Sequence, residues 1–247
     1  MKNTFLILLF CCLGIQVIKA QIVSGTVNYK VEADEEMMDD ILNEDRSEQL
    51  TAYLRMMFKN QVRTLPYLNY QLDFNQNESS FKKIETMATD DGFDLDKTAA
   101  NVGVQGVYHT NLEKDKTNHQ LNTWGKDILI THSISDFNWE ITKETKIIQG
   151  YQCYKATVKF KPDFGKGDVA TAWFTKEIPF QFGPAFYSGL PGLILEVKQG
   201  YYTFYADKIR LDKKPQNIAK PTKGKVVKLA DLEEVLHQMK MDYVKAR

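Results

Sequence analysis

The sequence predicts a mainly β protein with an antiparallel sheet, an N-terminal helical insertion and a C-terminal helix. Two observations lead to this fold class. Short segments in which apolar and polar residues alternate recur along most of the 247 residues, and a period of two is that of a half-buried strand. These segments also follow one another without helices between them, whereas a parallel α/β sheet alternates strands with helices.

In the first half of the chain, predicted strands surround one helical region. Ile22 to Val31 alternates and predicts the first strand. From Met37 to Met57 apolar residues recur every three or four positions, which predicts one or two amphipathic helices that end before Pro66. The polar, acidic stretch Thr89–Asn101 predicts a loop. Further strands are predicted at Leu68–Phe74, Phe81–Ile84, Gly103–Tyr108, His119–Trp124 and Asp127–His132, and around Trp139 and Ile141.

The last third of the chain has the sharpest pattern. Tyr154–Phe160 and Val169–Thr175 predict two strands joined by a hairpin turn at Gly165–Asp168. In Leu190-Pro191-Gly192 the proline fixes φ at about −65° and the glycine is free to take a positive φ, which predicts a type II turn. After this turn, strands are predicted at Leu193–Val197 and Tyr201–Ala206, then a polar linker over residues 212–224 and an amphipathic helix over Leu229–Val244.

Residues 1–20 have the features of a cleaved secretory signal peptide. Lys2 is followed by an apolar stretch from Phe5 to Ile18, and the small residue Ala20 precedes the expected cleavage site. The apolar stretch is shorter than the roughly 20 residues that span a bilayer, and we expect no transmembrane segment after cleavage. The sequence therefore predicts an exported protein (periplasmic, outer-membrane-associated or secreted) with a single β-rich domain over residues 21–247.

Charge and cysteine content narrow the classes of function. Loss of the leader, with its two lysines, would leave 30 basic side chains against 32 acidic ones. A nucleic-acid-binding domain is usually clearly basic, so we expect no nucleic-acid partner. Cys153 is the only cysteine outside the leader, so the mature chain has no intrachain disulfide. Its alternating surroundings predict a small buried side chain, with a reactive thiol or an intermolecular bridge as alternatives.

The segment Gly189-Leu190-Pro191-Gly192-Leu193-Ile194 and its surroundings carry a family resemblance. Ahead of it lie Gly150-Tyr151-x-Cys153-x-Lys155-Ala156 and Ala172-Trp173-Phe174-Thr175-x-Glu177-Ile178-Pro179. This ordered series resembles the GLPGLI family of exported Bacteroidota proteins, and the resemblance covers most of the mature chain, weakly between Glu32 and Gln61. It implies a strongly curved antiparallel sheet, a half-barrel similar to that of periplasmic lipoprotein carriers. The family has no assigned activity, so the resemblance implies no catalytic residues.

No pattern in the sequence predicts a catalytic residue, a metal site or a cofactor. A nucleophile elbow needs Gly-x-Ser-x-Gly, and the positions that should be glycine around Ser188 are Phe186 and Leu190. The four histidines lack the spacing of metal ligands. A hydrolase stays open as an alternative, because paired carboxylates at a suitable separation can cleave glycosides. Three glutamates lie near predicted strands: Glu140, Glu177 and Glu196.

Aromatic residues supply the remaining hypothesis. If a curved sheet leaves an apolar face open, a ligand or a partner protein must cover it. We take six rings as candidate ligand-binding residues, with ordinary core packing as the alternative: Trp173, Phe174, Phe186, Tyr187, Tyr202 and Phe204. The Gly189–Gly192 turn would set the angle at which Leu193 and Ile194 enter their strand.

The sequence thus predicts an exported, non-catalytic binding protein of the cell envelope, which carries a hydrophobic ligand or docks onto an envelope partner. One alternative is a structural or assembly subunit of an outer-membrane complex, for which we expect a fully packed sheet interior. The other is an uncharacterised hydrolase. The filling of the sheet interior is the feature that separates the first two.

Overall fold

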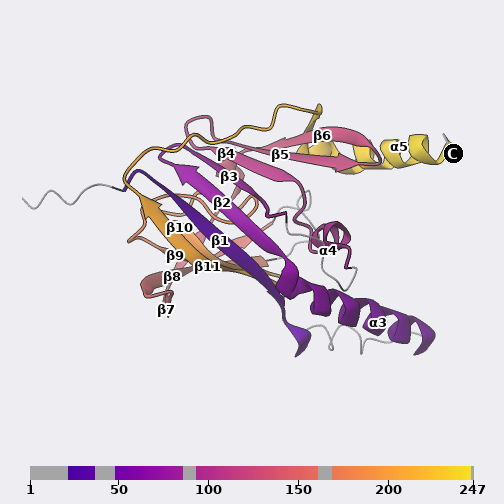
Figure 1. Cartoon of the computed structure of the whole chain (residues 1–247), viewed down its shortest axis with the longest axis horizontal. Helices are drawn as coiled ribbons and strands as arrows, with labels where there is room; N and C mark the ends of the chain where they lie inside the picture. The colour runs from indigo at the N-terminus through magenta and orange to yellow at the C-terminus, as the bar shows by residue number, and fades with distance from the viewer. Residues whose placement is uncertain (1–21, 37–47, 86–92, 161–168, 246–247) are drawn as a thin grey trace, which may run out of the picture.

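One twelve-stranded sheet forms the body of the protein. The computed structural model describes residues 22–36, 48–85, 93–160 and 169–245, and its strands lie in the order β12-β6-β5-β4-β3-β2-β1-β11-β10-β9-β8-β7. Neighbouring strands are antiparallel, except that β12 runs parallel to β6. The sheet is open and strongly curved (Figure 1). The predicted fold class is confirmed.

The elements have the following bounds in chain order. They are β1 (Ser24–Ala33), α3 (Glu48–Thr64), η1 (Leu65–Tyr67), β2 (Asn69–Asn75), β3 (Glu78–Lys83), α4 (Leu95–Asn101), β4 (Val107–Asn111), β5 (Lys116–Thr123), β6 (Lys126–His132), η2 (Ile134–Asp136), β7 (Glu140–Ile148), β8 (Tyr151–Lys159), β9 (Val169–Thr175), β10 (Leu193–Gln199), β11 (Tyr202–Asp212), β12 (Lys225–Lys228), η4 (Leu229–Asp231) and α5 (Leu232–Lys245).

The central strands β1 and β2 show how alternation becomes structure. Alternate residues in both strands are buried, and the residues between them are more exposed. Tyr29 lies opposite Tyr70 in the register, and such same-face pairs stabilise neighbouring strands. We call the face that carries these buried residues the inner face; it includes Val27, Tyr29, Val31, Tyr70, Leu72 and Phe74.

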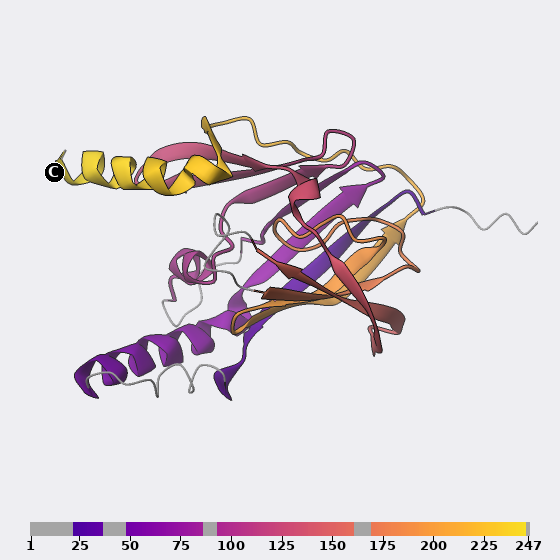
Figure 2. The same ribbon diagram turned by 180° about the vertical axis from the view of Figure 1, so that it is seen from behind.

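Residues 176–192, which we call the filling segment, lie against this inner face. Ile178, Phe180 and Phe182 are buried, and the ring of Phe74 lies 4.8 Å from that of Phe180 and 6.3 Å from that of Phe182. In Figure 2 the segment crosses in front of β1 and β2, inside the curve of the sheet. The protein's own side chains therefore occupy most of the sheet interior.

A β-bulge in β10 connects the filling segment to the sheet. The pairing of β10 with β9 shifts between Ile194 and Glu196. The N–H of Ile194 donates to the carbonyl oxygen of Phe182 at 2.9 Å, and the carbonyl of Ile194 accepts a hydrogen bond from the hydroxyl of Tyr29. Both backbone groups of Ile194 are thus paired inside the core, where an unpaired group costs about 1–3 kcal/mol.

The turn before β10 is not the type II turn that the sequence predicted. The N–H of Gly192 donates to the carbonyl of Leu190 at 2.7 Å, which makes a three-residue turn around Pro191. The N–H of Leu193 donates instead to the carbonyl of Ile178 at 2.9 Å, because the turn lies against the start of the filling segment, to which it also belongs. Position 192 requires glycine because the backbone of β9 lies close to it: a Cβ there would be 2.0 Å from the carbonyl oxygen of Thr175.

The loop predicted at Thr89–Asn101 contains a short helix, α4, in its described part. The side chain of Asp94 caps this helix by accepting from the N–H of Lys97 at 2.9 Å. The helix ends at Asn101, and a Schellman pattern follows it, in which Gly103 has a φ of +79° and the N–H of Val104 donates to the carbonyl of Ala99. Its buried residues are only Thr98 and Ala99, a signal too small to see as apolar periodicity.

Four predicted strands, which correspond to β3, β4, β5 and β8, start three or four residues away from the predicted position. The shifts of β4 and β3 have a local cause. The strand predicted from Gly103 begins at Val107, because Gly103 belongs to the turn that caps α4. The strand predicted from Phe81 begins earlier, at Glu78. The reason is a side-chain turn, in which the carbonyl of the Asn75 side chain accepts from two following backbone N–H groups and shortens the connection.

The C-terminal region contains one strand that the sequence analysis missed. Residues 213–224 lack regular structure, as predicted, but β12 follows and pairs with Ile128–Thr131 of β6. Four residues are too few for a recognisable alternating pattern. The predicted C-terminal helix is confirmed as η4 and α5. The predicted leader, the start of the helix predicted from Met37 and the Gly165–Asp168 turn lie outside the described residues.

The helices α3 and α5 project from the same end of the sheet, with α4 between them (Figures 1 and 2). In α3 only Thr64, its last residue, is buried. In α5, Met239 packs with Leu121, Ile128 and Ile130 of the β5–β6 hairpin. None of the helices in the described ranges has the combined length and apolarity that crossing a membrane requires.

Replacing Gly192 by alanine should cost at least about 3 kcal/mol of unfolding free energy, or prevent folding, because the new Cβ would overlap the backbone of β9. Gly150→Ala is the matched control. Gly150 has φ +83°, but a Cβ at this position would have nothing within 4 Å, so only the backbone cost of about 1–2 kcal/mol remains. Urea denaturation of both variants measures the difference, and equal losses would contradict the close-approach explanation.

Candidate functional site

A cleft of about 350 Å³ opens beside the bases of α3 and α4. We call it the aromatic cleft. Its lining has no charged residue. The lining residues are Val102, Gly103, Val104, Phe186, Tyr187, Val197, Gln199, Gly200, Tyr201, Tyr202 and Phe204. Four of the six rings predicted as ligand-binding residues, Phe186, Tyr187, Tyr202 and Phe204, therefore lie together.

The end of α4 forms one wall of the aromatic cleft. The turn from Val102 to Val104 follows the helix, and two core tyrosines hold its carbonyl groups. The hydroxyl of Tyr70 donates to the carbonyl of Val104 at 3.0 Å, and that of Tyr108 lies 3.5 Å from the carbonyl of Gly103. The backbone of this wall is therefore fixed from the core side, and it presents valine side chains to the cleft.

The turn between β10 and β11 forms the opposite wall and is in contact with α3. Gly200 takes a positive φ of +56°, which allows the tight connection between the two strands. The ring of Tyr201 packs edge-on against Phe58 at 5.7 Å, and the side-chain amide of Gln61 donates to the hydroxyl of Tyr202. The base of α3 thus supports the tyrosines that line this wall.

Phe186 and Tyr187, in the second half of the filling segment, reach the cleft from the inner face of the sheet. Phe186 stacks on Phe137 at 5.8 Å, with an interplanar angle of 17°. The hydroxyl of Tyr187 donates to the side-chain carbonyl of Gln199. Phe204, on β11, packs edge-on against Tyr70 at 5.7 Å. These contacts hold the rings in place from behind.

The cleft is apolar and uncharged at neutral pH. Burial raises the pKa of Tyr202, and the neighbouring Tyr201 raises it further, so its hydroxyl stays protonated. The hydroxyls of Tyr187 and Tyr202 already have partners within the protein. A charged ligand group would lose its hydration here without gaining a counter-charge, whereas an apolar group would gain from burial.

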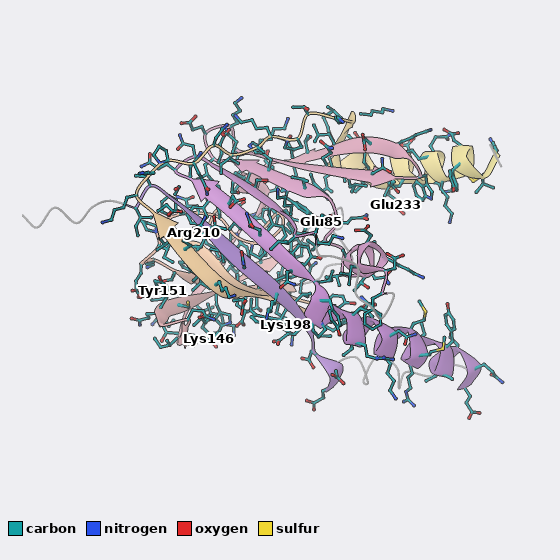
Figure 3. The ribbon with its side chains drawn as sticks, viewed as in Figure 1. Glu85, Lys146, Tyr151, Lys198, Arg210 and Glu233 are labelled. Atoms are coloured by element: carbon teal, nitrogen blue, oxygen red, sulfur yellow. The ribbon has the colours of Figure 1, made fainter. Side chains whose placement is uncertain are left out.

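Trp173 and Phe174 do not line the aromatic cleft. As neighbours in β9 they point to opposite faces of the sheet. Phe174 is fully buried and packs against Tyr154 at 5.9 Å. Trp173 lies on the outer face, where the ammonium of Lys146 is 4.5 Å from its ring centroid and also binds Glu196 at 2.7 Å. Figure 3 shows Lys146 on the part of the sheet formed by β7 and β8.

Sequence reasoning missed the residues that α4 and the β10–β11 turn contribute. Tyr201 belongs to the same aromatic run as Tyr202 and Phe204, so a detectable signal existed for it. Val102 and Val104 gave no signal, because their region was predicted as the end of a loop and the start of a strand. The Gly189–Ile194 turn lies outside the cleft, and its apolar side chains, Leu190, Leu193 and Ile194, are buried in the core.

Three of the residues considered for catalysis, Ser188, Glu177 and Glu196, have structural partners, and Glu140 is exposed at the start of β7. Ser188 is buried, with its hydroxyl 3.5 Å from the carbonyl of Phe186. Glu177 accepts from the N–H of Gln152 at 2.9 Å. Cys153 is fully buried, and burial raises the pKa of its thiol to about 11. In the described ranges, no three residues among His, Cys, Asp and Glu are grouped so that they could hold a metal ion.

A family model described as "Protein of unknown function (Porph_ging)" matches residues 160–196. The matched range includes β9, the filling segment and the Gly189–Ile194 turn, and it is a minor part of the chain. No match is found among curated proteins.

Several solved structures are similar to this chain. PNGF-II, in two crystal forms, aligns with a TM-score of 0.51 at 11% and 12% identity, covering 88% of this chain and 33% and 34% of PNGF-II. This chain thus spans about a third of PNGF-II, and the likeness shows the fold alone. The Mycobacterium tuberculosis lipoprotein LppX and a LolA superfamily protein from Nitrosomonas europaea align with a TM-score of 0.28, at 12% and 8% identity. They cover 85% and 78% of this chain and 93% and 88% of theirs.

The stability of the protein should fall as the pH falls from 7 to 5, and His119 should cause part of the loss. Its ring stacks on Tyr108 at 3.9 Å, and its Nε2 lies 2.7 Å from the carbonyl of Gln105. Burial lowers the pKa of His119 to about 4, whereas the unfolded chain has a value of about 6.5. The unfolded state therefore binds the proton first, and stability present above about pH 6.5 is lost toward pH 4.

We expect His119 to account for about 1–2 kcal/mol of unfolding free energy between pH 7 and pH 5. Urea denaturation at both pH values measures the loss. In His119→Gln this part of the pH dependence should disappear, whereas the control His237→Gln, at an exposed position on α5, should keep it. An unchanged pH dependence in His119→Gln would contradict the assignment.

Proposed function

We propose that this is an exported, non-catalytic binding protein that holds an uncharged apolar group in the aromatic cleft. The observation that supports the proposal is the lining of the cleft, which combines five rings with three valines and has no charged side chain. Its walls are fixed by hydrogen bonds within the protein. A preformed apolar cleft of this kind binds apolar groups without having to reorganise.

The size of the cleft limits the ligand. A volume of about 350 Å³ is at the small end of the range of roughly 300–1,000 Å³ that ligand pockets have. Each buried methylene-sized group contributes about 0.8 kcal/mol, before the cost of association is subtracted. The ligand is therefore a small apolar molecule, or the apolar part of a larger one whose remainder stays in solvent.

Docking onto an envelope partner, as a carrier or as an assembly subunit, is a second candidate. The filling segment occupies most of the sheet interior, as we expected for an assembly subunit. In addition, the two projecting helices expose apolar side chains, and exposed apolar surface is typical of protein interaction sites. These side chains are Leu50, Tyr53 and Met56 on α3, and Met241 and Val244 on α5.

Export and family membership form part of the proposal. The signal-like pattern of residues 1–20 supports export to the periplasm, the outer membrane or the medium. The ordered motif series around Gly189–Ile194, together with the family match over residues 160–196, supports membership of the GLPGLI family.

Val102→Trp should fill the aromatic cleft and weaken binding of an uncharged fluorescent probe, N-phenyl-1-naphthylamine, by at least about tenfold, or 1.4 kcal/mol. Val102 lines the cleft and is 8% exposed, so the larger ring can occupy the space that the probe needs. Fluorescence titration measures the affinity, and urea denaturation shows that the variant is folded.

Trp173→Phe is the control for this experiment, because Trp173 lies on the outer face and should not affect the probe. Probe binding that is equal in Val102→Trp and the parent protein would show that the probe binds elsewhere. A parent protein that binds no probe would contradict the ligand-binding proposal and favour the docking candidate.

A further inference from the structure

His109 is a buried imidazole that forms no hydrogen bond with another described residue. It lies in β4, between Ser80 of β3 and Asn118 of β5 in the register, and is only 3% exposed. Neither ring nitrogen has a hydrogen-bond partner among the described residues. Native proteins pair nearly all buried polar groups, so this histidine requires an explanation.

The only carboxylate found within 4 Å of the His109 ring belongs to Glu78, among the residues that the structure describes, and it is already engaged. The Nε2 of His109 lies 3.8 Å from Oε1 of Glu78, beyond hydrogen-bond distance. The same oxygen accepts from the side-chain amide of Asn111 at 2.7 Å and from the ammonium of Lys220 at 2.7 Å. Three potential donors therefore surround one oxygen atom, and the neutral imidazole is the one that does not bind it.

Lys220 belongs to residues 213–224, the connecting segment that leads from β11 to β12 along the sheet (Figure 1). Upstream, the side chain of Gln216 donates to the carbonyls of Gly25 and Phe74 at 2.6 and 3.0 Å, and Ile218 is buried. Downstream, β12 pairs with β6. The ion pair of Lys220 with Glu78 lies between these two attachments.

We propose that protonation of His109 releases the middle of the connecting segment from β3. Protonation turns a neutral neighbour of Glu78 into a cation, which competes with Lys220 for the same carboxylate oxygen and repels its ammonium group. Lys220 then leaves Glu78, and residues 219–224 lose their attachment to β3. Their other contact, the hydrogen bond from the N–H of Lys223 to the side-chain carbonyl of Gln120 at 3.2 Å, then opens more readily. Gln216, Ile218 and β12 keep the rest of the segment in place, so the release is local.

Burial and the charged groups around His109 restrict its protonation to acidic pH. Burial lowers the pKa of His109 below its usual value, the carboxylate of Glu78 opposes that shift, and Lys220 and Lys114 add to it. The register neighbours Ser80 and Asn118 carry no charge. His109 is therefore neutral at pH 7, where Lys220 holds Glu78, and it takes up its proton only as the pH falls below the usual range of histidine, about 6.5.

Amide hydrogen exchange of the mature chain at pH 7.5 and pH 5.0, corrected for the intrinsic exchange rate, tests the proposal. In the parent protein the protection of the Lys223 amide, which donates to the side-chain carbonyl of Gln120, should fall about tenfold at the lower pH, the scale expected for losing a charged hydrogen bond. His109→Gln should abolish this fall, because glutamine does not titrate. The control His237→Gln, at an exposed position on α5, should keep it. Protection that is equal at both pH values, or a fall that persists in His109→Gln, would overturn the proposal.

A second measurement does not depend on replacing His109. If protonation of His109 weakens the contact of Lys220, then removal of Lys220 must make His109 easier to protonate, because the coupling between two sites is reciprocal. NMR titration of the His109 ring in Lys220→Gln should therefore show a midpoint at higher pH than in the parent protein, and the Lys223 amide should exchange fast at both pH values. An unchanged midpoint, or unchanged protection at pH 7.5, would overturn the proposal.

Discussion

The carbonyl and amide of Ile194 connect the two parts on which the fold depends, the curved sheet and the filling segment. Strand β10 has a bulge at this point, so Ile194 turns its backbone groups toward the interior. There they pair with Tyr29 of β1 and Phe182 of the filling segment. A curved sheet that left its inner face open would expose apolar surface to water. The filling segment covers most of that surface, and the bulge fixes its position.

The aromatic cleft is the part of the inner face that the filling segment does not cover. The segment contributes Phe186 and Tyr187 to the lining of the cleft. The remaining walls come from the end of α4 and from the β10–β11 turn. These pieces are far apart in the sequence but are joined by hydrogen bonds of tyrosine hydroxyls to backbone and amide groups. Because α3 supports the same tyrosines through Phe58 and Gln61, the cleft and the projecting helix share one structural base.

The two faces of the sheet have different chemistry. The inner face is packed with rings and aliphatic side chains, and it offers a site for apolar groups. The outer face carries ion pairs, such as Lys146 with Glu196 and Lys198 with Asp34, and Lys198 lies near the base of α3 (Figure 3). Around Glu78 the outer polar network also includes a buried histidine. An apolar binding site and a pH-sensitive attachment can therefore coexist on one sheet.

The sequence by itself determined the elements whose pattern is local and long enough to recognise: the alternation of β1, β2 and β9, the amphipathic C-terminal helix, and the burial of Cys153. It could not show that Phe186, Tyr187, Tyr202 and Phe204 share a cleft from which Trp173 and Phe174 are absent. Alternation places Trp173 and Phe174 on opposite faces, but only the curvature and the filling segment decide which face is inner. The tertiary structure also decided the roles of α4, β12 and the turn at Gly192, because their geometry depends on partners distant in the chain.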